Sequence, residues 1–215
     1  MASRTYADRC GIARALDLVG ERWALLVVRE LLLGPKRFTD LRAGLPMIGP
    51  DVLSQRIREL ESSGLIERRE MPPPSRAHVY GLTPRGQQLE PVLLTLGRFG
   101  SIAPFPDGDA TFSPDAAVVA LKTTFRADAA AGVCLDLELR LGDWTYALRV
   151  ADEVLQVGLG AGRNPDAVIT ADASTMAAVL WHGLPLDAAL SSGSFEVTGD
   201  HTVVRQFLSL FPLPT

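Results

Sequence analysis

Apolar residues recur at helical spacing through the front of the chain. Positions three and four residues apart predict helices over 10–20 and 23–31, and a short helix over 39–44 whose first hydroxyl, on Thr39, suits a capping role. A fourth helix is predicted over 50–64. Its opening proline fits the first helical position, where the missing amide hydrogen costs nothing.

Extended segments follow these helices. Residues 65–69 and 79–82 flank a stiff proline-rich loop, 72–76, and predict a hairpin with a rigid basic tip. A last helix begins at Thr83 and is expected to kink at Pro91. Four helices, a hairpin and a helix form the order of a winged helix-turn-helix domain.

The rear of the chain alternates between apolar and polar residues, as a half-buried strand does. Residues 133–141 and 144–150 show this period of two on either side of a Gly-Asp turn, which predicts a second hairpin. Further runs extend one antiparallel sheet (154–159 and 167–170) or return to helical spacing (176–181, 186–190 and 203–211). The predicted fold class is α+β.

The balance of charge also differs between the front and the rear of the chain. Residues 1–100 hold 15 Lys/Arg and 11 Asp/Glu, a balance of +4, whereas residues 101–215 hold 6 and 14, a balance of −8. A proline- and glycine-containing stretch lies between them. We therefore expect a basic domain over 1–102, a linker over 103–112 and an acidic domain over 113–215.

The segment 50–64 has two different faces. Leu53, Ile57 and Leu60 share one stripe, while the opposite side is polar without being a lattice of opposite charges. That polar side consists of Asp51, Ser54, Gln55, Arg58 and Ser62. It is available to contact a partner.

The first hundred residues resemble the HxlR-type bacterial regulators, a winged-helix family related in fold to the MarR group. The matching words are RALDLVGERW from Arg14, LLLGPKRF from Leu31, VLSQRIRELE from Val52, GLIER from Gly64 and YGLTPRG from Tyr80. The resemblance implies a homodimer that places two recognition helices in successive major grooves of a pseudo-palindromic operator in double-stranded DNA, with the wings beside the backbone.

Residue chemistry fits that role. Gln55 can pair with adenine and Arg58 with guanine, each contributing about 1–3 kcal/mol of discrimination. The Ser54 hydroxyl is suited to contact a phosphate. For Arg56 and Arg58 the alternative is that they lie on a solvated helix face without a DNA partner. The candidate DNA contacts are Lys36, Arg37, Asp51, Ser54, Gln55, Arg56, Arg58 and Arg76.

The acidic domain resembles the sterol-carrier-protein (SCP) type of lipid-binding domain. Its supporting words are DAVITAD from Asp166, GLPLDAALSSG from Gly183 and FEVTGD from Phe195. The resemblance implies a curved sheet and covering helices around an apolar tunnel for a small apolar ligand, although ordinary core packing explains the same aromatic residues. The candidate pocket residues are Trp144, Trp181, Phe195, Phe207 and Phe211.

Only two cysteines are present, and Cys10 has Arg9 and Arg14 nearby, which would favour a reactive thiolate. Some HxlR-type proteins sense oxidants there, whereas the simpler alternative is a small residue near a dimer seam. The histidines (His78, His182 and His201) offer no metal-ligand spacing, and no catalytic motif is present. We therefore expect no enzyme activity, metal or cofactor.

Three functions remain open. The preferred one is a cytoplasmic, homodimeric DNA-binding transcriptional regulator whose acidic domain binds a small apolar effector. The alternatives are a lipid or small-molecule carrier that uses the winged helix for protein interaction, and a thiol-based redox sensor acting through Cys10. No apolar run is long enough to predict a membrane span, and no secretory signal precedes the first helix.

Overall fold

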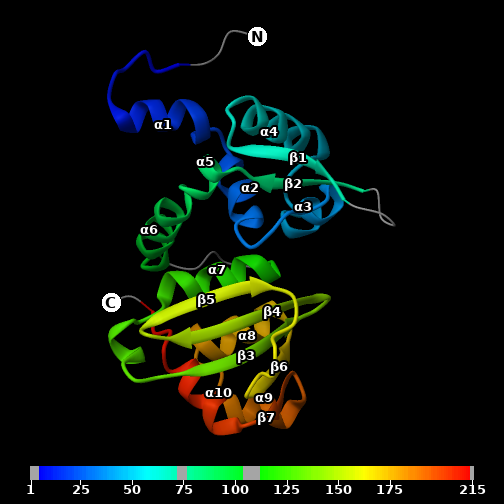
Figure 1. The fold of residues 1–215 in the computed structure, drawn as a ribbon, viewed down its shortest axis with the longest axis vertical. Helices are drawn as coiled ribbons and strands as arrows, with labels where there is room; N and C mark the ends of the chain where they lie inside the picture. Colours follow the sequence, from blue (N-terminus) through cyan, green and yellow to red (C-terminus); the bar gives the residue numbers. More distant parts are fainter. Residues whose placement is uncertain (1–4, 72–76, 104–111, 214–215) are drawn as a thin grey trace. The chain divides into compact units, whose positions relative to one another are not determined.

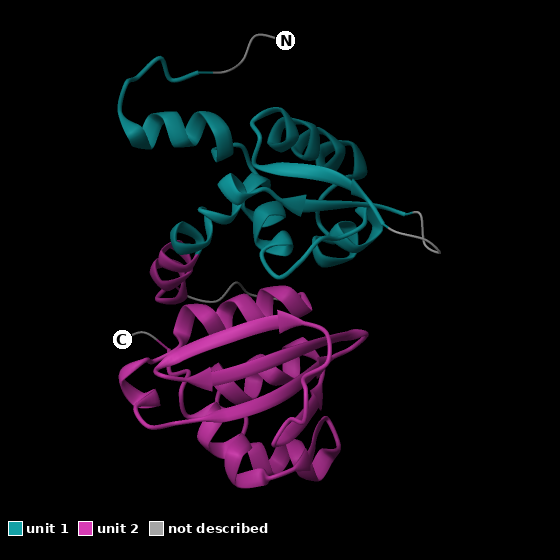
Figure 2. Ribbon diagram, in the orientation of Figure 1, with its two compact units in different colours: residues 1–93 teal, residues 94–215 magenta. Residues whose placement is uncertain are grey.

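The computed structural model describes residues 5–71, 77–103 and 112–213. The chain forms two compact units, residues 1–93 and 94–215, so that the division falls inside a helix (Figure 2). Among the described residues, no helix is both long and apolar enough to cross a membrane.

The first unit has the predicted winged-helix order (Figure 1). Its core gathers Val27, Leu31, Leu53, Ile57 and Leu60 with neighbouring apolar residues. Its elements are α1 (Gly11–Val19), α2 (Ala24–Leu31), α3 (Phe38–Gly44), α4 (Pro50–Ser62), β1 (Ile66–Glu70), β2 (His78–Leu82), α5 (Pro84–Gln87) and the start of α6 (Glu90–Ser101).

Two local predictions in this unit were wrong. Helix α3 begins at Phe38, one residue before Thr39. The carboxylate of Asp40 accepts the N–H of Arg37, the residue before the helix, at 3.1 Å, so an acidic side chain helps to cap this end. Pro91 does not kink a single helix. It lies in the first turn of α6, a position that tolerates proline, and α5 ends separately before it.

The second unit is a five-stranded sheet in the order β5-β4-β3-β6-β7. The pairs β5-β4, β4-β3 and β6-β7 are antiparallel, as predicted for one antiparallel sheet, whereas β6 pairs with β3 in parallel, which corrects that prediction for this pair. The elements are α7 (Pro114–Thr124), η1 (Asp128–Ala130), β3 (Leu135–Leu141), β4 (Trp144–Ala151), β5 (Val154–Leu159), β6 (Ala167–Ala171), α8 (Ala173–Trp181), α9 (Leu186–Ser192), β7 (Phe195–Gly199) and α10 (His201–Leu208).

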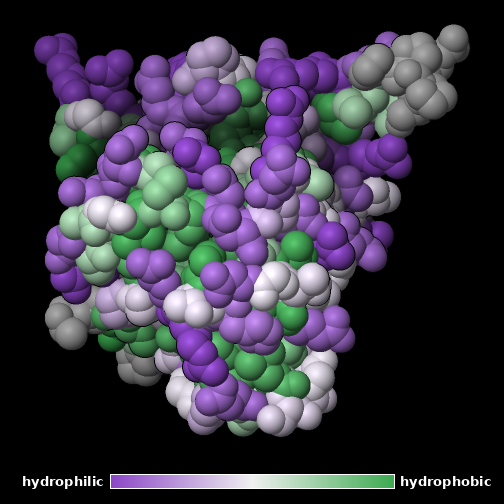
Figure 3. All heavy atoms as spheres, turned by 60° about the horizontal axis from the view of Figure 1, so that its bottom comes forward, coloured by the Kyte–Doolittle hydropathy of each residue, from purple (hydrophilic) through white to green (hydrophobic). Residues whose placement is uncertain are grey.

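Helices cover one face of this sheet, which we call the inner face. Tyr146 points to it, and its buried hydroxyl donates a 2.7 Å hydrogen bond to Asp115 of α7. Helices α8 and α10 lie on the same side (Figure 1). On the face of the molecule drawn in Figure 3, polar side chains lie between the apolar patches.

The aromatic residues predicted to line a pocket are mostly core. Phe195, Phe207 and Phe211 are buried, and the rings of Phe207 and Phe211 meet edge to face at 4.7 Å. Trp181 donates its indole N–H to the carbonyl of Phe211 at 3.0 Å, and Trp144, the first residue of β4, is half-buried. Phe211 therefore contacts both Phe207 and Trp181, and these aromatic residues pack in the core where the apolar tunnel was predicted.

Candidate nucleic-acid interface

Helices α3 and α4 form the helix-turn-helix, and α4 exposes a polar outer face. Leu53, Ile57 and Leu60 bury the opposite side in the core of the first unit. On the outer face Asp51, Arg58 and Ser62 are exposed, while Ser54 and Gln55 are half-buried. The sequence-predicted contacts on this helix therefore lie together, on the side turned away from the core.

A chain of hydrogen bonds crosses this outer face. Arg58 donates to Oε1 of Gln55 at 2.9 Å, and Gln55 Nε2 donates to Oε1 of Glu59 at 2.6 Å. The other carboxylate oxygen of Glu59 accepts from Arg56. Sequence reasoning missed Glu59, although its spacing of four from Gln55 and three from Arg56 is the spacing of paired helix side chains.

These hydrogen bonds separate the predicted contacts into side chains that are held within the protein and side chains that are exposed. The side chain of Arg56 is only 13% exposed, and it also lies 3.6 Å from Glu21, so it ties α4 to the turn before α2. The outer guanidinium of Arg58 is exposed. Both groups of the Gln55 amide have internal partners, so contact with a base edge requires these bonds to be exchanged for new ones.

Lys36 is not a surface cation. It is 4% exposed, and its ammonium lies 3.4 Å from the buried carboxylate of Glu30, which Arg29 also holds at 2.7 Å. Burial lowers the pKa of Lys36, and the Glu30 charge only partly offsets this effect. Lys36 is therefore a core ion-pair partner, which corrects its assignment to the phosphate contacts.

Glu30 and Lys36 also join separate elements. The carboxylate of Glu30 lies where a Cβ on Gly44, the last residue of α3, would come within 2.2 Å of it. The backbone of Lys36 exchanges two hydrogen bonds with Tyr80 of β2, at 2.9 and 2.7 Å. Glu30 is in phase with the buried Val27 and Leu31, a signal that sequence reasoning overlooked.

The remaining basic candidates lie around the helix-turn-helix. Arg37 is exposed at the cap of α3. In the wing, Arg68 is exposed and Arg69 pairs with Glu67 of the same strand. Arg76, predicted at the wing tip, lies outside the described residues.

Sequence comparison decides the family. The sequence model of the HxlR-like helix-turn-helix family matches residues 18–103. A relative named as the uncharacterised HTH-type transcriptional regulator YvaP, from Bacillus subtilis, is 35% identical over 41% of this chain and 82% of its own length. The chain belongs to the HxlR-like helix-turn-helix family. Membership confirms the predicted family and the predicted class of transcriptional regulator.

Other comparisons cover each half of this HxlR-like protein. The HTH-type regulator YodB from Bacillus subtilis is 37% identical over 36% of the chain and 70% of the relative. The reduced form of YodB, as a solved structure, is 32% identical over 47% of the chain and all of YodB, with a TM-score of 0.40.

Residues 110–215 match a family described as the alkyl sulfatase C-terminal domain. The sec-alkylsulfatase Pisa1 from Pseudomonas sp. is 20% identical over 52% of this chain, with a TM-score of 0.46. The HxlR-like chain spans only 19% of that enzyme. The likeness to the sterol-carrier-protein domain stays a prediction.

Proposed function

We propose that this HxlR-like protein binds a pseudo-palindromic operator in double-stranded DNA and reads it with the outer face of α4. The observation that carries the proposal is the exposed polar side of α4 opposite a fully buried apolar stripe, in a helix-turn-helix braced by a wing. A helix presented in this way fits the major groove.

Three groups of residues have different roles in this proposal. Gln55 and Arg58 contact base edges, because their amide and guanidinium can each form paired hydrogen bonds. Ser54 and Arg37 contact phosphates. Asp51 lies in the first turn of α4, where its negative charge stabilises the helix N-terminus. Its carboxylate can also accept a hydrogen bond from a cytosine amino group.

A second copy of the chain would cover two exposed apolar stripes. On α1, Ile12 is 73% exposed and Leu16 lies one turn further on. On α6, Leu96 and the 74% exposed Phe99 continue the stripe that begins at Val92. Solvent-exposed apolar stripes of this kind mark interaction surfaces, and we assign them to the homodimer.

Leu96→Glu tests the dimer. This variant should sediment as a monomer and lose operator affinity, because one recognition helix alone makes half the contacts. Val154→Glu changes an exposed apolar residue of β5 and is the matched control. A Leu96→Glu variant that stays dimeric and binds DNA normally would count against this interface.

DNA binding itself is tested by fluorescence anisotropy of the full chain with its own upstream DNA at increasing salt. Each phosphate contact should release condensed counterion, so the logarithm of the association constant should fall steeply with the logarithm of salt concentration. Affinity that does not change with salt would contradict the proposal.

One observation favours a thiol response as a second function. Cys10 is exposed at the cap position of α1, the helix that carries the first apolar stripe. Oxidation there would introduce a polar group or a cross-link beside the proposed dimer surface. Cys10→Ser should keep DNA binding and lose any response to diamide. An equal response in the wild type and in Cys10→Ser would show that Cys10 is not the sensing thiol.

A further inference from the structure

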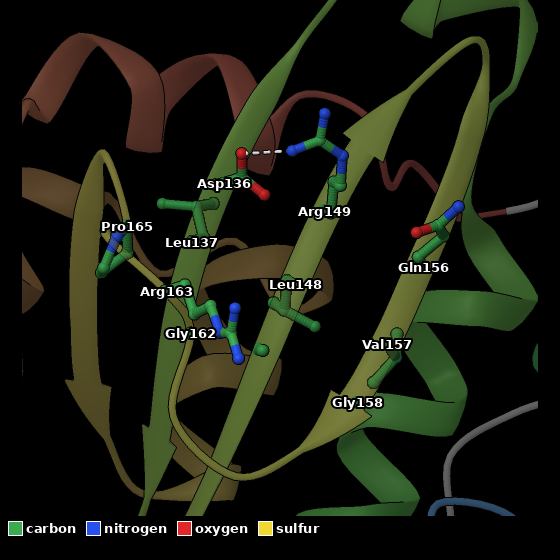
Figure 4. A pocket seen from close by; sticks show the side chains of 11 residues that line it. Asp136, Leu137, Leu148, Arg149, Gln156, Val157, Gly158, Gly162, Arg163 and Pro165 are labelled. Atoms are coloured by element: carbon green, nitrogen blue, oxygen red, sulfur yellow. Dashed lines mark hydrogen bonds and ion pairs between the residues drawn. The ribbon is translucent and has the colours of Figure 1, made fainter.

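The second unit carries an open cup on the outer face of its sheet, opposite the helices. The cup has a volume of about 430 Å³ and lies between the surface of β3, β4 and β5 and the loop that leads into β6 (Figure 4). This volume falls in the range of small-ligand sites, about 300–1,000 Å³. None of the five predicted pocket residues lines it.

The floor of the cup is flat because two small residues face each other across the strands. Ala147 of β4 pairs directly with Gly158 of β5. A Cβ added to Gly158 would meet no atom within 4 Å, so the space above this strand is open. A planar apolar group can lie on such a surface without displacing a side chain.

The wall of the cup is held in place by the sheet. Gly160 N–H donates to the carbonyl of Thr145 at 2.8 Å, and Gly162 N–H donates to the buried carboxylate of Glu138 at 3.2 Å. At the far end Asp166 N–H donates to the carbonyl of Asp136 at 2.8 Å. Three attachments along seven residues give the wall a defined position before any ligand arrives.

Positive charge gathers at this cup within an otherwise acidic half. Residues 101–215 contain six basic residues, and two of them, Arg149 and Arg163, line it. Arg149 is paired with Asp136 at 2.6 Å. Arg163 reaches from the loop over the sheet (Figure 4), and within the described part of the chain no hydrogen bond or ion pair engages its guanidinium.

We propose that the cup binds a small organic monoanion with a flat apolar body. The body lies over Ala147 and Gly158, and its carboxylate takes paired hydrogen bonds from Arg163. Gln156, on the opposite rim, supplies a polar group for orientation. One unengaged guanidinium matches one negative charge, since Asp136 already neutralises Arg149. This inference does not depend on the proposed DNA binding.

Ligand-observed ¹⁹F NMR tests it with the full chain. The probe is 4-fluorobenzoate, and 4-fluorobenzamide is the neutral comparator of the same shape. The wild-type protein should broaden the resonance of the benzoate and leave that of the benzamide nearly unchanged. Arg163→Ala should weaken benzoate binding at least about tenfold, as expected for the loss of a charged hydrogen-bonding partner.

Two further variants separate binding from folding. Gly158→Leu extends a side chain into the cup from a position where the new Cβ meets no protein atom within 4 Å, so it should abolish binding while the far-UV circular dichroism spectrum stays unchanged. Arg205→Ala removes an arginine on α10, outside the cup, and should bind benzoate as the wild type does.

The proposal is overturned if wild-type protein binds neither compound, if it binds both equally, or if Gly158→Leu still binds. It is also overturned if Arg205→Ala weakens binding as much as Arg163→Ala. Because Arg163→Ala should retain the salt-dependent DNA affinity of the wild type, failure of the anion site and failure of the DNA proposal are distinguishable.

Discussion

Replacing Lys36 by methionine should destabilise the first unit, because the charge removed is a core ion-pair partner. At 3.4 Å from Glu30 and an effective dielectric constant of about 20, the attraction is about 5 kcal/mol before desolvation is counted. Removing one partner of a buried pair costs about 3–5 kcal/mol. Arg29 still holds the Glu30 carboxylate, so we expect the lower end, about 3 kcal/mol.

Amide hydrogen exchange of α2 and α4, measured by mass spectrometry, reports the opening free energy of the first unit separately from the second. The double variant Glu30→Gln/Lys36→Met should recover a large part of the loss, because no uncompensated charge stays buried. Arg37→Met is the matched control at the next, exposed position. It should change stability by less than about 0.5 kcal/mol.

For DNA binding we expect the opposite order, with a larger effect of Arg37→Met than of Lys36→Met. Arg37→Met should lower the salt slope of binding by about one, as the loss of one phosphate contact does. If Lys36→Met kept wild-type protection while its salt slope fell in this way, Lys36 would be a surface phosphate contact, and our reassignment of it would be wrong.

Three further substitutions test local packing. Asp172 accepts the N–H of Thr175 at 2.7 Å and caps α8; burial alone would raise its pKa, but the hydrogen bonds from Thr175 lower it below the usual 3.8. Asp172→Ala should cost about 1 kcal/mol at neutral pH, and its deficit in urea unfolding should shrink as the pH falls through the folded-state pKa, where the wild-type carboxylate becomes protonated. Phe207→Ala should cost about 3–5 kcal/mol in the same assay, since it leaves a cavity beside Phe211. Gly86→Ala would put a Cβ 2.0 Å from a backbone oxygen of Leu65 and should lower the melting temperature, whereas the unobstructed Gly100→Ala should not.

Sequence patterns predicted the elements whose periodicity is strong. The stripe of Leu53, Ile57 and Leu60 located α4, and alternation located β3 and β4. The same alternation is compatible with parallel and antiparallel pairing, so it did not predict how β6 joins β3. Helix α7 was missed because nearly every residue of it is buried, which removes the polar face that marks a helix.

The candidate sites depended on contacts between distant residues. A lysine is expected at the surface, and only the folded chain brings Lys36 beside Glu30. The cup likewise depends on the register that sets Ala147 against Gly158 and on the loop that positions Arg163. In sequence, these three residues carry no shared motif.

Selectivity for the protein's own upstream DNA tests the central claim most directly. The measurement is the ratio of affinities for that DNA and for a scrambled duplex, compared between wild type and Gln55→Ala/Arg58→Ala. We predict that the wild type prefers its own DNA and that the double variant brings the ratio close to one while keeping salt-dependent binding. An unchanged ratio in the double variant would contradict sequence reading by the outer face of α4.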